Sequence, residues 1–309
     1  MRPVSLFVLI LLMCASQAEA GDDNNRPSTA MVKPYSRIIS LYSAHTENLV
    51  SLGAAERLIG ISVSDDYPEE ILSKPRFSYR EDPEKFIAAR PDLVLVRPMI
   101  ERSYPQLLSK LSQAGIAVIS LQPNSVEEIF DYWRVLGALA GRPRAAEKMI
   151  ASFQHGLGRI HDVIRAIPAE QRPRVYFESI HKKMKTFAPC SIAIFALEQA
   201  GGVNVARDAH QVRQTNIADY GKERILANGA GIDVFIAQQG RMNPVDLETI
   251  MDEPGFLAVK AVRDGRVFLV DERLVSRPTL RIVEGVRQLS SILYPELFCA
   301  GKGGNIHGR

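Results

Sequence analysis

The chain has 309 residues, of which 46% are hydrophobic and 24% are charged. This composition is ordinary for a soluble globular protein and excludes the disordered and fibrous classes. The formal net charge is +3, and the longest block of basic residues is Lys182-Lys183, so the charge pattern gives no footprint for a nucleic-acid partner.

The first twenty residues have the pattern of a secretory signal peptide. Arg2 precedes an apolar run from Val4 to Met13, and Ala18-Glu19-Ala20 supplies a small-residue cleavage site. About ten apolar residues are too few to span a bilayer, which takes about twenty. We therefore expect residues 1–20 to be removed on export to the periplasm. A lipid anchor at Cys14 is the less favoured alternative, because Met13 stands where lipoprotein signals have a small residue.

Residues 37–53 are expected to form the floor of a ligand cleft. Ile38, Ile39 and Leu41 form a short apolar run that favours a strand. The stretch 43–46 supplies small polar side chains that can cap a helix, and Gly53 ends that helix. Such a junction directs backbone N–H groups and the positive end of the helix dipole beyond the strand's carboxyl end, where α/β folds bind ligands. An ordinary strand-to-helix junction is the alternative.

The first half of the chain alternates strand-like and helix-like segments. Residues 21–35 are polar and without periodicity, so we expect a flexible lead-in. Within residues 36–142 the further expected strands are 58–63, 92–96 and 116–121, and the further expected helices are 83–89, 103–114 and 125–140. Ser125 is the expected N-cap of the last helix, with Glu128 completing a capping box.

The longest periodic run covers residues 143–167. Pro143 opens it, and its apolar positions fall three or four apart: Met149, Ile150, Phe153, Leu157, Ile160, Ile164 and Ile167. One helix of this length spans roughly 35 Å, which suits a rod between two lobes better than a crossover within one. Gly156 and Gly158 weaken it somewhat.

The second half, residues 168–298, repeats the pattern of the first. The expected strands are 174–178, 232–237 and 266–270, and the expected helices are 191–199 (amphipathic), 223–227, 247–251 and 279–293. The stretch 92–96 matches 233–237. The sequence therefore predicts an α/β fold with two Rossmann-like lobes, mostly parallel sheets and a single long rigid connecting helix, followed by a tail at 299–309.

Four motifs occur in an order that resembles a known family. They are S-L-x-x-A-x-T-E from Ser40, D-Y-P at 66–68, A-A-R-P-D-L-V-L-V at 88–96 and A-G-G-V-N at 200–204. This order is similar to that of the periplasmic substrate-binding proteins that serve ABC importers of cobalamin and iron-siderophores, over roughly residues 37–298. The resemblance implies the class III fold, a monomer, no intrinsic cofactor, and the importer's permease and ATPase as partners.

The candidate ligand-binding residues follow the strand ends, where open α/β sheets bind ligands. Tyr67 and the 77–80 loop are added because the matching loops of the family lie near the ligand. The set is Tyr42, His45, Tyr67, Tyr79, Arg80, Arg97, His181, Lys185, Phe187, Arg241 and Arg277. Aromatic faces would cover the rings of a planar metal chelate, cations would pair with its anionic oxygens, and His45 or His181 would be axial donors.

No motif indicates an enzyme. The chain contains no GxGxxG, GxxxxGK[ST], GxSxG or HExxH sequence. Cys190 and Cys299 remain after signal removal and can either pair or stay free in an oxidising compartment. Cys190, at the start of a helix, is either a small buried residue or a thiolate able to ligate a metal.

The resemblance implies that the protein captures a metal chelate, either a corrinoid such as cobalamin or a ferric siderophore, and delivers it to the importer. The alternatives are haem binding in the same family, a bare metal ion or oxyanion held by His45, His181, His210 and a carboxylate, and an extracytoplasmic enzyme or chelatase. One acidic residue in each lobe docks on the permease in this family. Glu101, and Glu248 or Asp246, stand in the corresponding loops. A single long helix bends little, so we expect modest closure on the ligand.

Overall fold

The computed structural model describes residues 34–123, 125–213 and 215–298. The expected signal peptide, Cys14, most of the expected lead-in, Cys299 and the expected tail lie outside these residues. All described residues belong to one structural unit. None of the described helices is both long and apolar enough to cross a bilayer.

The N-terminal lobe is built on a five-stranded parallel sheet in the order β3-β2-β1-β4-β5. Its strands are β1 Ile38–Ser40, β2 Leu58–Ser62, β3 Arg76–Phe77, β4 Leu93–Val96 and β5 Ala117–Ser120. Its helices are α1 Ser43–Ser51, α2 Pro83–Ala89, α3 Pro98–Ser103, α4 Pro105–Gln113 and α5 Glu127–Leu139. β4 is fully buried, as expected for a parallel strand with neighbours on both sides and helices on both faces.

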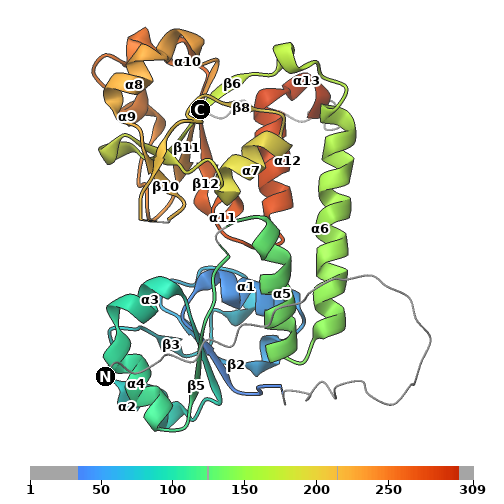
Figure 1. The fold of residues 1–309 in the computed structure, drawn as a ribbon, viewed down its shortest axis with the longest axis vertical. Helices are drawn as coiled ribbons and strands as arrows, with labels where there is room; N and C mark the ends of the chain where they lie inside the picture. Colours follow the sequence, from blue (N-terminus) through green and yellow to red (C-terminus); the bar gives the residue numbers. More distant parts are fainter. Residues whose placement is uncertain (1–33, 124, 214, 299–309) are drawn as a thin grey trace, which may run out of the picture. The chain divides into compact units, whose positions relative to one another are not determined.

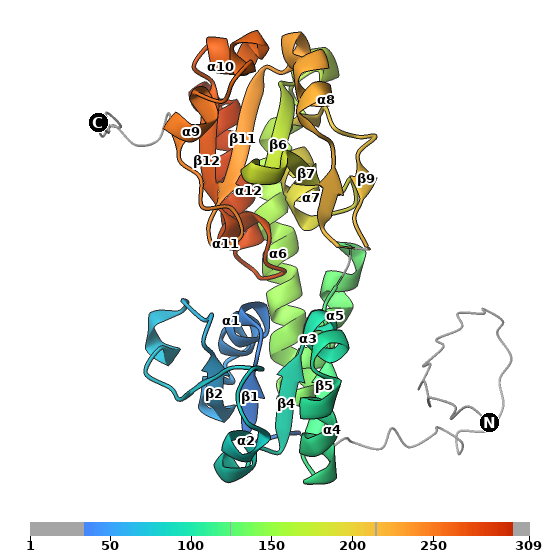
Figure 2. The ribbon, with the colours of Figure 1, turned by 90° about the vertical axis from the view of Figure 1, so that its left-hand side faces the viewer.

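The C-terminal lobe has a sheet in the order β12-β11-β6-β7-β10-β9, with β8 also paired to β6 (Figure 2). Its strands are β6 Arg174–Ile180, β7 Lys185–Phe187, β8 Val203–Asn204, β9 His210–Gln211, β10 Ile217–Asp219, β11 Val234–Gln239 and β12 Val267–Asp271. Its helices are α7 Ile192–Gln199, α8 Lys222–Ala227, α9 Leu247–Met251, α10 Lys260–Arg263, α11 Glu272–Val275, α12 Ile282–Leu293 and α13 Pro295–Phe298.

The two-lobed α/β fold with parallel sheets is confirmed, but the C-terminal sheet also has an antiparallel part. β12, β11, β6 and β8 are parallel, whereas β7, β10 and β9 pair antiparallel beyond β6. These added strands were not expected from the sequence. They have only two or three residues each, too few for an alternating pattern to be recognised.

The repeat between the two halves extends to the side chains that start the strands. Asp92, just before β4, accepts hydrogen bonds from the backbone amides of Ser36 and Arg37, just before β1. Asp233, just before β11, accepts one from the amide of Arg174 at the start of β6. Each lobe therefore uses an aspartate to fix the start of the neighbouring strand.

The long helix α6, Pro143–Ile164, contacts elements of both lobes. It packs against α5 near its start and against α12 and α7 farther along (Figure 1). Its buried side chains join one hydrophobic cluster that includes Ile38 and Leu93 of the first sheet and Phe177 and Val234 of the second. The predicted connection between two lobes is confirmed, although the helix ends three residues before Ile167.

Several predicted boundaries or environments were wrong. The expected helix at 103–114 is divided into α3 and α4 before Pro105, a residue that has no N–H for a continuous helix. α5 begins at Glu127 with Val126 as its N-cap, rather than at Ser125. The last long helix begins at Ile282 instead of 279. α7 is buried over most of its surface rather than amphipathic.

Two glycines of α6 give a matched pair of predictions. A Cβ on Gly156 would lie 2.7 Å from Cγ1 of Val283 in α12, whereas a Cβ on Gly158 would meet nothing within 4 Å. Gly158→Ala should therefore stabilise the protein by about 0.5–1 kcal/mol through helix propensity. Gly156→Ala should destabilise it by about 1 kcal/mol, because the clash with the stiff valine exceeds that gain. Urea unfolding of both variants checks this, and equal effects of the two substitutions would contradict the tight packing of α6 on α12.

Candidate functional site

The first turns of α1 carry polar side chains that are buried. Ser43 through Leu49 are all buried, and the N-cap residue Tyr42 makes no side-chain cap. The expected capping by residues 43–46 was therefore wrong. Thr46 instead donates its hydroxyl hydrogen to one acceptor and lies 2.8 Å from Ser40 Oγ and 2.7 Å from Asp65 Oδ2, while Ser43 Oγ donates to the Ser64 carbonyl. These contacts connect the helix to the carboxyl ends of β1 and β2.

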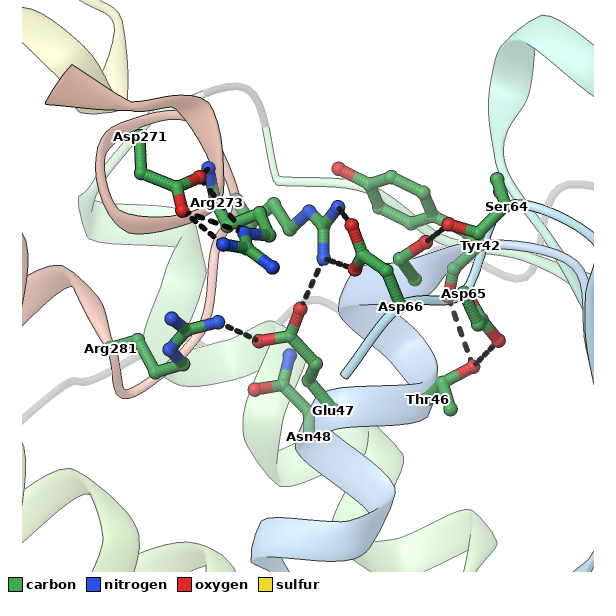
Figure 3. A network of polar contacts seen from close by, with 12 residues as sticks. Tyr42, Thr46, Glu47, Asn48, Ser64, Asp65, Asp66, Asp271, Arg273 and Arg281 are labelled. Carbon is green, nitrogen blue, oxygen red and sulfur yellow. Dashed lines mark hydrogen bonds and ion pairs between the residues drawn. The ribbon is translucent and has the colours of Figure 1, made fainter. Parts of the chain in front are cut away.

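An ion-pair network joins α1 to the loop before α12. Arg277 Nη1 lies 2.5 Å from Oε1 of Glu47 and 2.8 Å from Oδ1 of Asp66, and its Nη2 lies 3.2 Å from Asp66 Oδ2. Arg281 Nη1 is 3.8 Å from the other oxygen of Glu47 (Figure 3). We call these four residues the Arg277 network. Burial raises the pKa of Glu47, and the two arginines oppose that shift.

The same loop is held by two further contacts from the N-terminal lobe. Asn48 Nδ2 and Trp133 Nε1 both donate to the carbonyl oxygen of Pro278, at 2.9 and 3.2 Å. The guanidinium of Arg281 lies over the ring of Tyr67, 4.1 Å from its centroid. Arg277 was expected to contact the ligand, but it forms ion pairs with the N-terminal lobe instead. Its partner Glu47 lies 230 positions away in the chain, so no pattern in the sequence indicated this pairing.

Aromatic rings and cations lie beside each other at the strand ends of the N-terminal lobe. Arg97, after β4, places its guanidinium 5.1 Å from the ring centroid of Tyr42, after β1. Tyr79 packs on Tyr104 with ring centroids 4.7 Å apart, and exposed Arg80 lies 5.7 Å from the Tyr79 centroid. The structure thus places Tyr42 beside Arg97 and Tyr79 beside Arg80. Each pair combines an aromatic ring with a positive charge.

His45 is not available to a ligand in this structure. Its side chain is 0% exposed, and its Nε2 lies 2.9 Å from the carbonyl oxygen of Leu121, to which it donates. Burial, together with the charge of Arg97, lowers the pKa of His45 to about 3, so the ring is neutral. Its ring packs against Tyr42 and Tyr132. His45 was expected to face the cleft as an axial donor. This expectation was wrong, because the ring is buried.

His181 follows β6 and lies among acidic side chains. Its Nδ1 is 3.1 Å from both carboxylate oxygens of Glu178, and its Nε2 is 3.5 Å from Oε2 of Glu253. Its backbone N–H donates to Oδ1 of Asn243 at 2.9 Å. The hydrogen bond with Glu178 raises the pKa of His181, although burial opposes this.

A pocket of about 710 Å³ opens beside His181 in the C-terminal lobe. Its walls come from the turn after β6, the loop after β11 and α9, and they include His181, Met184, Met242, Asn243, Thr249 and Glu253. Met242 is half exposed and Met184 packs against the second core cluster of the lobe. The pocket therefore combines thioether and other apolar surface with one imidazole, the carboxylate of Glu253 and the cations Lys182 and Lys183.

The other candidate residues lie in different environments. Lys185 pairs with Asp219 at 2.8 Å, and Arg241 is exposed in the loop after β11. Phe187 is buried in the core against Phe177, so the expectation of a ligand contact was wrong. It belongs to the large hydrophobic cluster that also contains Phe177, and the two ring centroids are 4.9 Å apart.

The acidic candidates for docking are exposed at matching places in the two lobes. Glu101 lies in α3, the helix after β4, and Glu248 lies in α9, the helix after β11. Asp246 is the N-cap of α9 and accepts from the amide of Thr249. Glu101 and Glu248 therefore lie in helices that follow corresponding strands, whereas the family resemblance led us to expect them in loops.

Of the remaining histidines and cysteines, those described are surface residues. His155 and His161 are exposed on α6, His210 is exposed on β9, and Cys190 is a free, exposed thiol before α7. Among the described residues, no group of three or more His, Cys, Asp or Glu could hold a metal ion. The expected convergence of His45, His181 and His210 with a carboxylate is therefore not found in this part of the chain.

Four acidic residues with polar contacts in the site were not expected from the sequence: Glu47, Asp66, Glu178 and Glu253. Glu178 gave a signal, because a glutamate inside an otherwise apolar strand must find a partner when buried. Asp66 and Glu47 belong to the motifs that carry the family resemblance, but their spacing did not show that they meet an arginine. Glu253 lies in a polar segment, where nothing in the sequence sets it apart from other surface acids.

Comparisons with known proteins agree with this architecture. A family model described as a periplasmic binding protein matches residues 38–274. The chain is 25% identical over 280 residues to YvrC, an uncharacterised ABC transporter substrate-binding lipoprotein of Bacillus subtilis, with 90% of this chain and 86% of that protein covered. It is 25% identical over 263 residues to the vitamin B12-binding protein of Vibrio cholerae, with 84% and 90% covered. The crystal structure of a possible iron-binding (periplasmic solute-binding) protein from Staphylococcus epidermidis superposes with a TM-score of 0.72 at 29% identity, covering 85% of this chain and 100% of that one.

Proposed function

The chain belongs to the periplasmic binding protein family, and from this premise we propose that it captures a metal chelate outside the cytoplasm and delivers it to an ABC importer. The importer's permease and ATPase are then its partners, and its role is stoichiometric binding rather than catalysis. The observation that carries the proposal is the pocket at the carboxyl end of β6, whose lining joins apolar side chains with the cations Lys182 and Lys183.

The names of the relatives support a chelate as cargo. One relative is a vitamin B12-binding protein, and a structural relative is described as possibly iron-binding. The strand ends of the N-terminal lobe carry ring surface at Tyr42 and Tyr79 and positive charge at Arg80 and Arg97, which suit a large ring system bearing anionic groups. Corrinoids, ferric siderophores and haem all meet this description.

Analysis of the molecule that accompanies the purified protein tests the proposal. Native mass spectrometry should detect one chelate per chain, and absorption spectroscopy should show the visible bands of its metal centre. A colourless protein that binds a bare ion or an oxyanion would contradict the proposal, as would turnover of the chelate during incubation. Loading the stripped protein with aquocobalamin, ferric siderophore or haem then identifies the class by dissociation constant.

We further propose that Glu101 and Glu248 dock on the permease. Both carboxylates are exposed at equivalent places of the two lobes. The double variant Glu101→Ala and Glu248→Ala should bind cargo normally but support at most a tenth of ATP-driven uptake into vesicles that contain the importer. Unchanged uptake would assign docking to other residues. The exposed Glu147 and Glu170, replaced in the same way, provide the control.

A further inference from the structure

We propose that protonated His181 is a pH-sensitive latch, which ties α9 to the end of β6 in the wall of the pocket. The role of this latch in cargo binding rests on the proposed function, whereas the latch itself belongs to the cargo-free protein. Three features support it: a carboxylate beside each nitrogen of the ring, the burial of these groups, and the different chain segments from which they come.

A carboxylate lies beside each nitrogen of the imidazole. Nδ1 of His181 is 3.1 Å from both oxygens of Glu178, and Nε2 is 3.5 Å from Oε2 of Glu253, an ion-pair contact. An ionised carboxylate only accepts hydrogen bonds, so each contact is favourable when the nitrogen carries a hydrogen. A neutral ring has one hydrogen and would turn a lone pair toward one carboxylate. The surroundings therefore favour the imidazolium, which has no lone pair for a metal, contrary to the expected role as an axial donor.

Burial makes the charge of the ring matter. Glu178 is 0% exposed and His181 is 6% exposed, so water screens their interaction little. The hydrogen bond with Glu178 raises the pKa of His181 from its usual 6.5, burial opposes this rise, and the charge of Glu253 adds to it. Burial also raises the pKa of Glu178, against the hydrogen bond with His181. The buried pair therefore keeps its proton to a higher pH than a free histidine does.

The other charged or titratable groups near the ring come from β6, α8 and the turn at 181–183. Nζ of Lys222 in α8 lies 2.6 Å from the second oxygen of Glu253. Burial raises the pKa of Tyr176, which lies on β6 near Glu178, so this phenol is neutral. The adjacent cations, both exposed, are Lys182 and Lys183. Since ordinary lysine side chains do not titrate near neutral pH, the charge that changes there belongs to the histidine.

The contacts of His181 join three segments that line the pocket. His181 begins the turn after β6, Glu253 follows α9, and Asn243 lies in the loop after β11. The backbone N–H of His181 donates to Oδ1 of Asn243 at 2.9 Å, and this bond does not depend on the ring proton. Loss of the proton should therefore release the α9 side and leave the β11 loop attached.

The sign of the pH dependence follows from the direction of the shift. The pKa of His181 is raised in the folded protein, so the latch is complete below about pH 6.5 and is lost as the pH rises through the higher folded value. A pocket whose wall is already ordered loses less conformational freedom on binding. Cargo should therefore bind more tightly at the lower pH.

Hydrogen exchange of the cargo-free protein tests the latch. After correction for the intrinsic rate, amide protection in 249–256 should fall at least about five-fold between about pH 6 and about pH 9, and protection in 242–245 by less than about two-fold. His181→Gln should give low protection of 249–256 at both pH values. Glu253→Gln, which removes the carboxylate that repels a neutral ring, should also abolish the pH dependence. His155→Gln, at an exposed position of α6, is the control and should keep it.

Hemin is the probe for the role of the latch in binding. Its dissociation constant should rise at least about five-fold over the same pH range for the wild type, and by less than about two-fold for His181→Gln. Equal pH dependence of the two proteins, or no binding of hemin, would overturn this role.

The outcomes separate the latch from the function on which its role depends. Protection that is constant with pH, or that falls equally in the wild type and in His181→Gln, would overturn the latch whatever the cargo is. If the exchange result holds and the hemin result fails, the latch stands without a role in hemin capture. If the native ligand is no metal chelate, the proposed function fails, while the latch, measured without cargo, stands.

Discussion

Replacing Arg277 with methionine will lower the free energy of unfolding by about 3–5 kcal/mol, because the substitution leaves a buried carboxylate without its main partner. Glu47 is 2% exposed, and after the change its nearest cation is Arg281, at 3.8 Å. Asp66 is more exposed and can be hydrated. Urea unfolding, followed by the emission of Trp133, the chain's single tryptophan, measures the loss.

Two controls make this prediction specific to the Arg277 network. Arg165→Met removes an ion pair with Asp162 in which the side chains are 67% and 64% exposed, so its effect should stay below about 1 kcal/mol. The double variant Glu47→Gln and Arg277→Met should recover much of the loss, since no buried charge then remains unpaired. A loss no larger for Arg277→Met than for Arg165→Met would show that the network does not hold the loop before α12 in place.

Replacing Phe153 with alanine should cost about 3–5 kcal/mol, the range for removing a buried aromatic side chain. Phe153 lies in the middle of α6, is 1% exposed, and packs edge-on against Trp133 and Phe130 of α5 at centroid distances of 5.3 and 5.8 Å. The resulting cavity would remove packing contacts between α6 and α5. Chemical denaturation of the purified variant gives the value.

Val163→Ala is the matched control for Phe153→Ala. Val163 is on the same helix but is 36% exposed, so its truncation should cost less than about 1 kcal/mol. Phe153→Leu should lie between the two, because most of the volume is retained. Equal effects of Phe153→Ala and Val163→Ala would mean that α6 does not stabilise the fold through its contact with α5.

The fold followed from the sequence more completely than the site did. The alternation of strands and helices and the long helix from Pro143 followed from periodicity, because the side that a residue buries repeats with the local geometry of its element. The boundary errors at Pro105 and Ser125 are also local, since they depend on single residues at helix ends. For the site, the sequence located the ends of the strands. It did not show which side chains at those ends are accessible to a ligand and which are buried or paired.

The amino-acid sequence by itself determined two α/β halves, the helix between them, and His181 at the end of a buried strand. The tertiary structure alone decided that His45 is enclosed, that Phe187 is part of the core, and that Arg277 pairs with Glu47 across 230 residues. The physical reason is that periodic patterns report only how each segment is buried along its own length. The partner of a buried polar group is set by the packing of segments that are distant in the chain, and each such group must find one there.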